Sequence, residues 1–555
     1  MYDNRIKVTN TAIIVDNYEL GESEKLEHSF QVYNPVTHKF DSIGYYYDEE
    51  NKRMYLPGGM DLWYVRKCLD EKYFTRIDPS PYKQTKRIGM KYKPRDDEQI
   101  QILQFITGTN PEYADNDKAP QLSIASFTGV GKTYCSIATI AYYQIKSIVI
   151  TGSNSLLSQW KGNILEYTNL SDSDIFRISG SDICNMILNG SSAKAENASI
   201  YLCSHGTLRS FAERYGWEKV NELFRKLGIG MKFYDEAHQN FENMLMIDFF
   251  TNIHKTFYVT ATPGRSSWRE NHIYQISIKN VPMIDLFDEQ KHPHTSYIAI
   301  KWNSNPTPLD ISKCKSNMYG LDRNKYMEYL TNKPEFYQMM HVAMDLVIKC
   351  KGRALLYIGT NDGILRVYYW ICNNYPEFIG DIGIFTSIIS KEEKAIAKQK
   401  KLILSTTKSA GAGEHIEHLK LSMILAEPFK SPILAQQTLG RTRDADTLYI
   451  EFVDLGFKYT KKYYYAKLPV FNKYAKDVSD MVIDKYEMEK RSSNIIKSRT
   501  HWQQSPITFI DNRFDFDKIV PDFIKNDDIP EPGVPYCPIK FIEKNDNNSN
   551  SFRSY

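Results

Sequence analysis

The chain has 555 residues, of which 25% are charged and 42% are hydrophobic, and its formal net charge is +3. This length exceeds one ordinary core, so about two to four domains are expected. The composition is typical of a soluble globular protein and excludes binding of nucleic acid through net charge alone. Any basic surface must therefore be local.

No run of the sequence approaches the roughly 20 apolar residues that cross a bilayer, and the first residues lack the apolar stretch of a signal peptide. The eight cysteines show no short spacing of the kind that binds zinc or forms a redox pair. Buried thiols in a reducing compartment fit this pattern. We therefore expect a cytoplasmic protein without a membrane partner.

Residues 1–92 form a mixed region with short alternating runs and turn signals such as Pro57-Gly58-Gly59. We expect an N-terminal accessory domain here. The adjoining stretch 83–95 is rich in lysine and arginine. It fits either a solvated linker or an arm that binds a nucleic-acid backbone.

Between residues 93 and 285, short β-prone runs alternate with helix-like segments, which is typical of a parallel sheet with helices on both faces. The runs are 123–125, 147–150, 200–203, 232–234 and 257–259. The same alternation returns over 341–456, with runs at 354–358, 382–385, 402–404, 422–425 and 448–452. Two similar α/β domains are therefore predicted.

The remaining segments are expected to join or extend these two domains. Residues 286–340 are predicted to be a connector, with a loop rich in proline and asparagine at 302–308. Residues 457–555 are predicted to form a helical C-terminal extension that ends in a tail with the composition of a disordered segment.

The segment 126–133 reads Ser-Phe-Thr-Gly-Val-Gly-Lys-Thr and lies between a β-prone run and a helix-compatible stretch. A strand, a glycine-containing loop and a helix start surround one anion with backbone N–H groups. Lys132 can reach the β and γ phosphates, and the Thr133 hydroxyl can bind Mg²⁺. The pattern predicts an ATP site, although Ser126 replaces the usual first glycine. The loop residues expected to contact the phosphates are Thr128, Gly129, Val130 and Gly131.

Two adjacent carboxylates, Asp235 and Glu236, follow another β-prone run at a predicted strand end. Ligand sites of parallel sheets lie at this edge. Mg²⁺ prefers hard oxygen ligands and keeps waters, so Asp235 can hold the ion through water. Glu236 can orient or deprotonate the attacking water.

A third segment, with Gln437, Gly440 and Arg441, is expected to be a helix start that faces a cleft between the two domains. An arginine that reaches the γ-phosphate only when the domains close would couple hydrolysis to motion. By itself a Gly-Arg pair is a weak signal.

These segments resemble a superfamily-2 helicase or translocase of the DEAH-type group, and are most similar to viral and bacteriophage members. The resemblance covers residues 94–456, and further segments that carry it are 94–99, 148–160, 204–208, 260–263, 357–361 and 405–413. It implies an α/β fold with two tandem RecA-like parallel-sheet domains, the N-terminal accessory region and the helical C-terminal extension.

The resemblance also implies roles for individual residues. Gln99 would contact adenine, and His238 and Gly413 would belong to the nucleotide site. Together with His238, Thr260 and Thr262 would relay the nucleotide state to the strand-binding surface. The residues implied to contact the nucleic-acid backbone are Ser153, Ser204, Thr207, Thr360, Asn361 and Thr407.

Several positions depart from the family pattern. Gly152 replaces a usual proline, His415 replaces a common acidic residue, and Asp444 replaces the second arginine of the arginine motif. Arg443 lies one position earlier. Either Arg443 substitutes through a local shift, or the second phosphate contact is absent.

The resemblance implies an ATPase that closes its two domains on ATP and advances along a strand, with DNA favoured over RNA and 3′ to 5′ polarity. A monomer in the cytoplasm, or in the host cytoplasm for a viral protein, is expected. The alternatives are an RNA helicase, a duplex translocase that does not unwind, and an ATP-switched binding module such as an assembly or transcription-release factor.

The tract 458–465 mixes lysines with tyrosines. Single-strand binders combine cations with stackable rings in this way. A helix that packs its rings and extends its lysines to solvent gives the same pattern.

Overall fold

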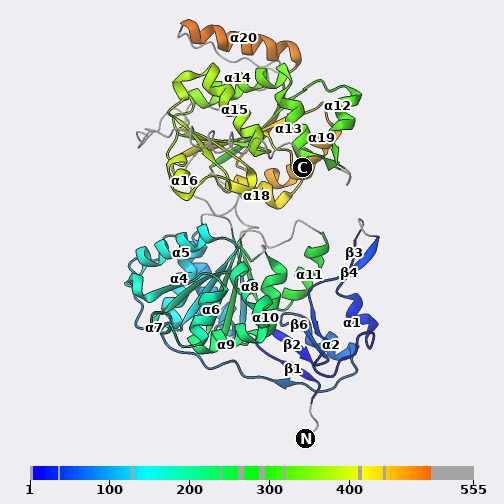
Figure 1. Cartoon of the computed structure of the whole chain (residues 1–555), viewed down its shortest axis with the longest axis vertical. Coiled ribbons are helices and arrows are strands. Elements are labelled where there is room, and N and C mark those ends of the chain that lie inside the picture. Colours follow the sequence, from blue (N-terminus) through cyan, green and yellow to red (C-terminus); the bar gives the residue numbers. More distant parts are fainter. Residues whose placement is uncertain are drawn as a thin grey trace. The chain divides into compact units, whose positions relative to one another are not determined.

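The computed structural model describes residues 4–34, 38–126, 130–237, 240–260, 268–286, 294–316, 320–410, 416–441 and 446–501. The chain forms two compact units, Met1–Glu289 and Gln290–Tyr555 (Figure 1). Each unit is described by itself below.

In the described part of unit 1, seven parallel strands form one sheet in the order β10-β11-β9-β12-β13-β8-β14. The inner strands are buried on both faces, so their sequences are mostly apolar, with a few buried polar residues such as Ser123 and Lys232. Every run predicted between 93 and 285 lies within one of these strands. Their bounds are β8 Gln121–Ala125, β9 Ser147–Thr151, β10 Ile175–Ile178, β11 Ile200–Ser204, β12 Met231–Asp235, β13 Lys255–Thr260 and β14 Met283–Asp285.

Alternate side chains of these strands enter two different cores, because successive residues of a strand point to opposite faces. Phe233 packs in the core beneath one group of helices: α3 Asp97–Thr107, α4 Lys132–Tyr143 and α5 Asn154–Tyr167. Tyr234 packs in the other core, which takes residues from α6 Ser181–Leu188, α7 Ala193–Asn197, α8 His205–Tyr215, α9 Trp217–Leu227, α10 Phe241–Phe250 and α11 Trp268–Ile278.

The N-terminal region adds a five-stranded sheet with the order β5-β6-β2-β1-β7, and a separate hairpin of β3 and β4. Its apolar residues belong to the same core as α8, α9 and α10. Tyr55 stacks on Phe250 with ring centroids 4.9 Å apart. Within unit 1, the N-terminal region therefore shares one core with the helices on this face of the parallel sheet. Its elements are β1 Ile6–Val8, β2 Ala12–Val15, α1 Glu24–His28, β3 Gln31–Asn34, β4 Lys39–Ser42, β5 Tyr46–Asp48, β6 Arg53–Pro57, α2 Leu62–Cys68 and β7 Thr75–Arg76.

The described part of unit 2 contains a second seven-stranded parallel sheet, in the order β19-β20-β18-β21-β22-β15-β23. All five runs predicted between 341 and 456 lie within its strands. The α/β class with two tandem parallel-sheet domains of RecA-like type is thus confirmed. The strands are β15 Thr295–Trp302, β18 Arg353–Ile358, β19 Ile382–Phe385, β20 Leu402–Ser405, β21 Leu419–Ala426, β22 Thr447–Asp454 and β23 Val478–Val482.

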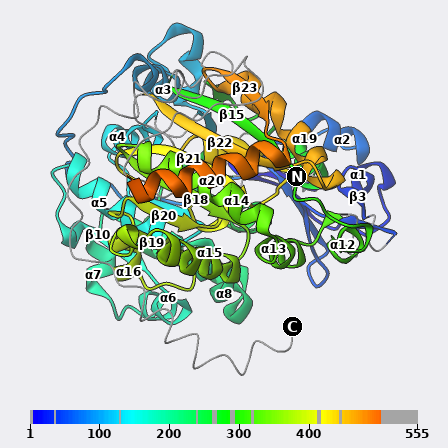
Figure 2. The same ribbon diagram turned by 90° about the horizontal axis from the view of Figure 1, so that it is seen from above.

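The helices of unit 2 cover this sheet, and α20 lies beside α14 in both views (Figures 1 and 2). β16 Lys315–Ser316 pairs with β17 Gly320–Leu321 in antiparallel orientation. The helices are α12 Pro308–Lys313, α13 Arg323–Thr331, α14 Pro334–Lys349, α15 Asn361–Asn374, α16 Lys391–Ala397, α17 Thr407–Ala410, α18 Pro432–Leu439, α19 Lys458–Tyr474 and α20 Lys485–His501. Among the described helices, none is both long and apolar enough to cross a membrane.

Two strands of this sheet come from segments that the sequence does not assign to it. β15 arises from the expected connector 286–340 and lies between β22 and β23. It is almost fully buried, so it is a core strand of unit 2. β23 arises from the expected helical extension 457–555. Its polar, partly exposed sequence gives a weak strand signal, and its pairing with β15 defines it.

Candidate nucleotide and nucleic-acid site

The predicted phosphate loop lies between β8 and α4. Gly131 has φ of 99°, in the left-handed region that favours glycine. A Cβ at this position would come within 2.2 Å of the Gln99 side-chain nitrogen. Gly131 is also the N-cap of α4 and brings no side chain to the first-turn amides. The helix N-terminus is therefore suited to an anion. Thr128 and Gly129 lie outside the described residues.

Lys132 and Thr133 begin α4. The Lys132 ammonium donates to the carbonyl oxygen of Ser126 at 2.7 Å, so the amine lies across the loop. The Ser126 N–H in turn donates to the Thr260 carbonyl at 3.2 Å. The start of the loop is thereby tied to the end of β13, where the predicted relay residue Thr260 lies. Thr262 lies outside the described residues.

Gln99, the predicted adenine contact, is buried in α3 and bonded at both ends of its amide. Its oxygen accepts from the Arg95 N–H at 2.9 Å, and its nitrogen donates to the Val130 carbonyl at 3.0 Å. Gln99 therefore links the segment before α3 to the phosphate loop. Contact with adenine stays a prediction.

The acid pair lies at the carboxyl end of β12. Asp235 accepts from the Trp160 indole N–H at 2.7 Å and from the Glu236 backbone N–H at 3.0 Å. Glu236 has a left-handed φ of 54° and is buried. Burial and the neighbouring Glu236 charge raise the pKa of Asp235 to about 6, while the Trp160 hydrogen bond and the Lys132 charge oppose this rise. The ionised form of Asp235 is therefore destabilised, and a nearby cation would stabilise it.

Trp160 is a residue of this site that the sequence does not reveal. The sequence places it in a segment expected to contact nucleic acid, whereas its ring is buried and its N–H meets Asp235. Spacing along the chain gave no signal of a contact 75 residues away.

The side chains present fit Mg²⁺ and a nucleotide. The Thr133 hydroxyl and the Asp235 carboxylate are hard oxygen donors at the two expected positions. Among the described residues there is no cluster of three or more histidine, cysteine, aspartate or glutamate side chains that would form an all-protein metal cage. Mg²⁺ commonly keeps waters and phosphate oxygens as its other ligands. His238 and Gly413 lie outside the described residues.

Three of the predicted nucleic-acid contacts meet at the same sheet edge of unit 1. Ser153 caps α5, and Ser204 caps α8 by accepting from the Thr207 N–H at 3.2 Å. The Ser204 and Thr207 hydroxyls lie 3.0 Å apart. β9 and β11 are paired neighbours, so these helix starts lie next to each other. Helix N-termini of this kind suit phosphate groups.

The three predicted contacts of unit 2 differ from one another. Thr360 caps α15 by accepting from the Gly363 N–H at 3.0 Å, and Asn361 is the first helical residue. Thr407 is only 1% exposed, and its hydroxyl donates to Glu427 at 2.5 Å. The Thr407 side chain is therefore committed to an internal carboxylate, and burial rather than the motif decides its contacts.

The arginine segment lies at a helix end, so the prediction of a helix start is wrong. Ser431 caps α18 and Pro432 begins it, a common start because proline has no N–H to lose there. Gln437 lies in the last turn, and Gly440 is the C-cap. Arg441 follows, is 4% exposed, and donates its N–H to the Thr438 carbonyl at 3.2 Å. Arg443 lies outside the described residues.

The lysine and tyrosine tract belongs to α19. Tyr464 and Lys467 are buried, and Lys467 pairs with Glu451. The Lys467 ammonium also lies 4.1 Å from the centre of the Phe429 ring. Tyr465 is exposed. Packing therefore accounts for the inner side of this helix.

A family model described as "Type III restriction enzyme, res subunit" matches residues 91–265. The match contains the phosphate loop and the acid pair but less than half of the chain. It supports a nucleic-acid-dependent ATPase of the helicase kind. Among curated protein sequences, none is significantly similar to this chain.

Several solved structures are similar at low identity. T4 UvsW has 14% identity and a TM-score of 0.33, over 86% of this chain and 99% of that one. Dbp5 of S. cerevisiae, bound to RNA and ADP BeF3, has 14% identity and a TM-score of 0.48, over 72% and 93%. A fragment of a putative HsdR subunit of a type I restriction enzyme from Vibrio vulnificus YJ016 has 12% identity and a TM-score of 0.46, over 82% and 78%.

Proposed function

We propose that the protein is an ATP-dependent nucleic-acid motor, a helicase or translocase that acts on DNA. The observation that carries this proposal is the composition of one sheet edge in unit 1. The phosphate loop follows β8, the acid pair ends β12, and the serine-capped helix starts follow β9 and β11. Because these strands are parallel, all of these groups lie at their carboxyl ends, where α/β sheets bind ligands.

The chemistry follows from the side chains at this edge. Bound Mg²⁺ and ATP supply the transferable phosphoryl group and part of its charge neutralisation. Lys132 holds phosphate oxygens in place of the Ser126 carbonyl, and Thr133 and Asp235 hold the ion. Glu236 orients the attacking water and accepts its proton.

The second domain has a proposed part in the same reaction. Arg441 is assigned as the arginine that stabilises charge on the transferring group, with Gln437 and Arg443 beside it. In this proposal the RecA-like domains comprise 93–285 and 341–456, with β15 and β23 completing the sheet of the second. Replacing Arg441 with alanine should lower kcat with little change in the ATP dissociation constant, which separates this role from nucleotide binding.

The finer assignments belong to the same proposal. They are the DEAH-type subgroup, a viral or bacteriophage origin, DNA as the track, 3′ to 5′ movement, a cytoplasmic monomer, and a relay through His238, Thr260 and Thr262. Contacts of helix caps and hydroxyls with the phosphate backbone carry no base identity. Binding should therefore be independent of sequence and should weaken as salt rises.

The proposal is tested by steady-state ATP hydrolysis without polynucleotide and then with single-stranded DNA, forked DNA or RNA. Lys132→Ala controls for contaminating ATPases. Strong stimulation by DNA that the variant lacks supports the motor, and strand separation on the fork identifies a helicase. Preferential stimulation by RNA would make RNA the track. Tight ATP-dependent binding with negligible turnover would contradict a motor and favour an ATP-switched binding module.

A further inference from the structure

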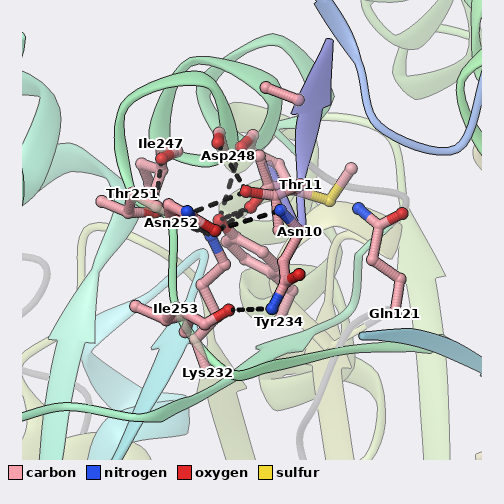
Figure 3. Close-up of polar contacts among 12 residues, drawn as sticks. Asn10, Thr11, Gln121, Lys232, Tyr234, Ile247, Asp248, Thr251, Asn252 and Ile253 are labelled. Carbon is pink, nitrogen blue, oxygen red and sulfur yellow. Dashed lines mark hydrogen bonds and ion pairs between the residues drawn. The ribbon is translucent and has the colours of Figure 1, made fainter. Parts of the chain in front are cut away.

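A buried polar cluster lies on the face of the unit 1 sheet that α10 covers, and it includes the residue before the acid pair (Figure 3 shows Lys232, Tyr234 and Asp248). We name it the Asp248 cluster; its members are Lys232 and Tyr234 of β12, Tyr258 of β13 and Asp248 of α10. Asp248 is 2% exposed, and the other three side chains are equally enclosed. The functional assignments above leave this cluster without a role.

The Asp248 carboxylate ties two strands to one helix. Its Oδ1 accepts from the Tyr234 hydroxyl at 2.7 Å, and its Oδ2 accepts from the Tyr258 hydroxyl at 2.6 Å. The Lys232 ammonium lies 2.5 Å from Oδ1. Burial raises the pKa of both tyrosines well above the usual range and lowers that of Lys232. The hydroxyls therefore stay protonated and act as donors.

The two tyrosine rings continue a stack that begins at α8. The His205 ring lies parallel to that of Tyr234, with centroids 5.7 Å apart and an interplanar angle of 13°. Tyr234 and Tyr258 are paired in register and stack at 5.7 Å and 5°. Neither ring nitrogen of His205 has a hydrogen-bond partner in the described part of the chain. The position of the His205 ring is therefore set by packing, not by hydrogen bonds. His205 directly follows Ser204, the N-cap of α8.

The C-terminal end of α10, which carries Asp248, is fixed by the N-terminal region. The Thr11 hydroxyl donates to the carbonyls of Asp248 at 2.8 Å and Thr251 at 3.1 Å (Figure 3). The Asn10 N–H donates to the Asn252 side chain at 3.0 Å. Lys232 also donates to the Thr251 hydroxyl at 2.7 Å. α10 is thus anchored at its last turn, which gives Asp248 a fixed position.

Folding energy alone does not account for this arrangement. A buried ion pair is commonly no more stabilising than apolar side chains of the same volume, because both charges lose their hydration. The cluster lies on the two strands whose ends carry Asp235 and Thr260, and the positions of these residues affect ATP hydrolysis in the proposed function. Tyr234 is the residue before Asp235, and Tyr258 lies two residues before Thr260, which bonds the phosphate loop.

We propose that Asp248 is a positioning residue that couples the start of α8 to the acid pair, by holding the Tyr234 and Tyr258 rings in one stack with His205. This inference rests on the proposed function. A shift of α8 when nucleic acid binds would pass through the rings to the ends of β12 and β13. Because Asp248 bonds one tyrosine on each strand, the ends of β12 and β13 that carry Asp235 and Thr260 would move together.

The test removes hydroxyls and keeps the rings. In the full chain, the double variant Tyr234→Phe/Tyr258→Phe keeps both rings but removes the two hydroxyls that donate to Asp248, together with the bond that the Gln121 side chain donates to the Tyr258 hydroxyl at 2.9 Å. Tyr201→Phe is the matched control, because Tyr201 is a fully buried tyrosine of β11 in the same sheet whose hydroxyl donates to the Ala195 carbonyl at 2.9 Å. The measurements are the KM for ATP, basal kcat, polynucleotide-stimulated kcat and the thermal midpoint.

We expect the double variant to lose stimulated kcat by about tenfold, because small misplacement of catalytic groups is costly. The KM for ATP should stay close to that of Tyr201→Phe, whereas the thermal midpoint should fall further, because the buried Asp248 carboxylate loses two donors; kcat is therefore compared per folded protein. A stimulated kcat equal to that of the control overturns the inference. So does a loss of kcat that only follows a loss of folded protein.

A second pair of variants tests the stack itself. His205→Leu removes the ring from the stack, and His205→Phe restores an aromatic ring of similar size. Stimulation by polynucleotide should fall in His205→Leu and return in His205→Phe. Equal stimulation in both variants overturns the role of the stack.

Failure of the proposed function gives a different result. If no polynucleotide stimulates the wild-type protein, the motor proposal fails and the coupling between α8 and the acid pair fails with it. Basal kcat then decides the positioning role of Asp248. A fall in the double variant relative to Tyr201→Phe supports that role, and equality overturns it.

Discussion

Burial and the Glu236 charge destabilise the ionised form of Asp235, and the hydrogen bond from the Trp160 indole N–H is the largest effect that stabilises it. Replacing Trp160 with phenylalanine removes the hydrogen bond that favours the carboxylate, so the pKa of Asp235 should rise above its present value of about 6. A raised carboxyl pKa means that the ionised form dominates only at higher pH. The acidic limb of kcat/KM for ATP, which reports the free enzyme, should therefore move to higher pH.

Trp217→Phe is the control, because this ring stacks on Phe250 and does not contact Asp235. Near pH 6 the Trp160→Phe variant should lose activity by a factor of about 3 or more, with a smaller loss at pH 8. An unchanged acidic limb would show that another group controls it.

His205 predicts a loss of stability in acid. Burial lowers the pKa of its imidazole from 6.5 to about 4. Between these values the unfolded chain binds a proton that the folded chain excludes, so the free energy of unfolding must fall as pH falls. Lowering the pKa from 6.5 to about 4 corresponds to a full effect of about 3 kcal/mol on the free energy of unfolding. Urea unfolding at pH 7 and pH 4.5 measures it, and His205→Phe should show a smaller drop between the two.

At the scale of elements, the phosphate loop depends on one backbone conformation. Gly131→Ala would place a side chain at φ of 99° and a Cβ 2.2 Å from Gln99. Strain of this kind costs about 1–3 kcal/mol, so ATP affinity should fall about tenfold or more. Isothermal titration measures the dissociation constant. In a Gln99→Ala background the overlap is absent but the strained φ remains, so Gly131→Ala should still lower affinity relative to Gln99→Ala alone; equal affinity of these two variants would contradict backbone strain.

The sequence predicts five neighbouring strands of each sheet, because their short runs are rich in β-branched and aromatic residues, but it misses β10, β14, β15 and β23. It also predicts the phosphate loop and the acid pair, which are local patterns. Contacts between distant elements are different. The bond from Trp160 to Asp235 and the carboxylate of Asp248 beneath Tyr234 give no local signal, since an aspartate in a helix is usually exposed. A motif likewise does not define where its helix begins, as Arg441 shows.

At the scale of the molecule, the N-terminal region and the first RecA-like domain are one cooperative unit. Ile13 is buried in the core that both share. Ile13→Ala should therefore destabilise the whole of unit 1 by about 2–5 kcal/mol. As urea is added, ATP binding and the structure of the N-terminal sheet should be lost at the same concentration. Nucleotide titration measures the first and hydrogen exchange of the strand amides measures the second. Exchange of the N-terminal strands while ATP binding persists would show that the region unfolds separately.

The bond from Asn10 to Asn252 has a consequence for how the chain is made. The two residues are separated by 242 positions. The turn that contains Asn10 is therefore synthesised long before Asn252, the residue to which it bonds. At typical rates of synthesis this interval is roughly 10 to 50 s. Until α10 emerges, α1 and α2 can cover part of the N-terminal sheet, but the apolar residues that pack on α10 stay uncovered. We therefore expect the newborn chain to be most prone to aggregation during that interval.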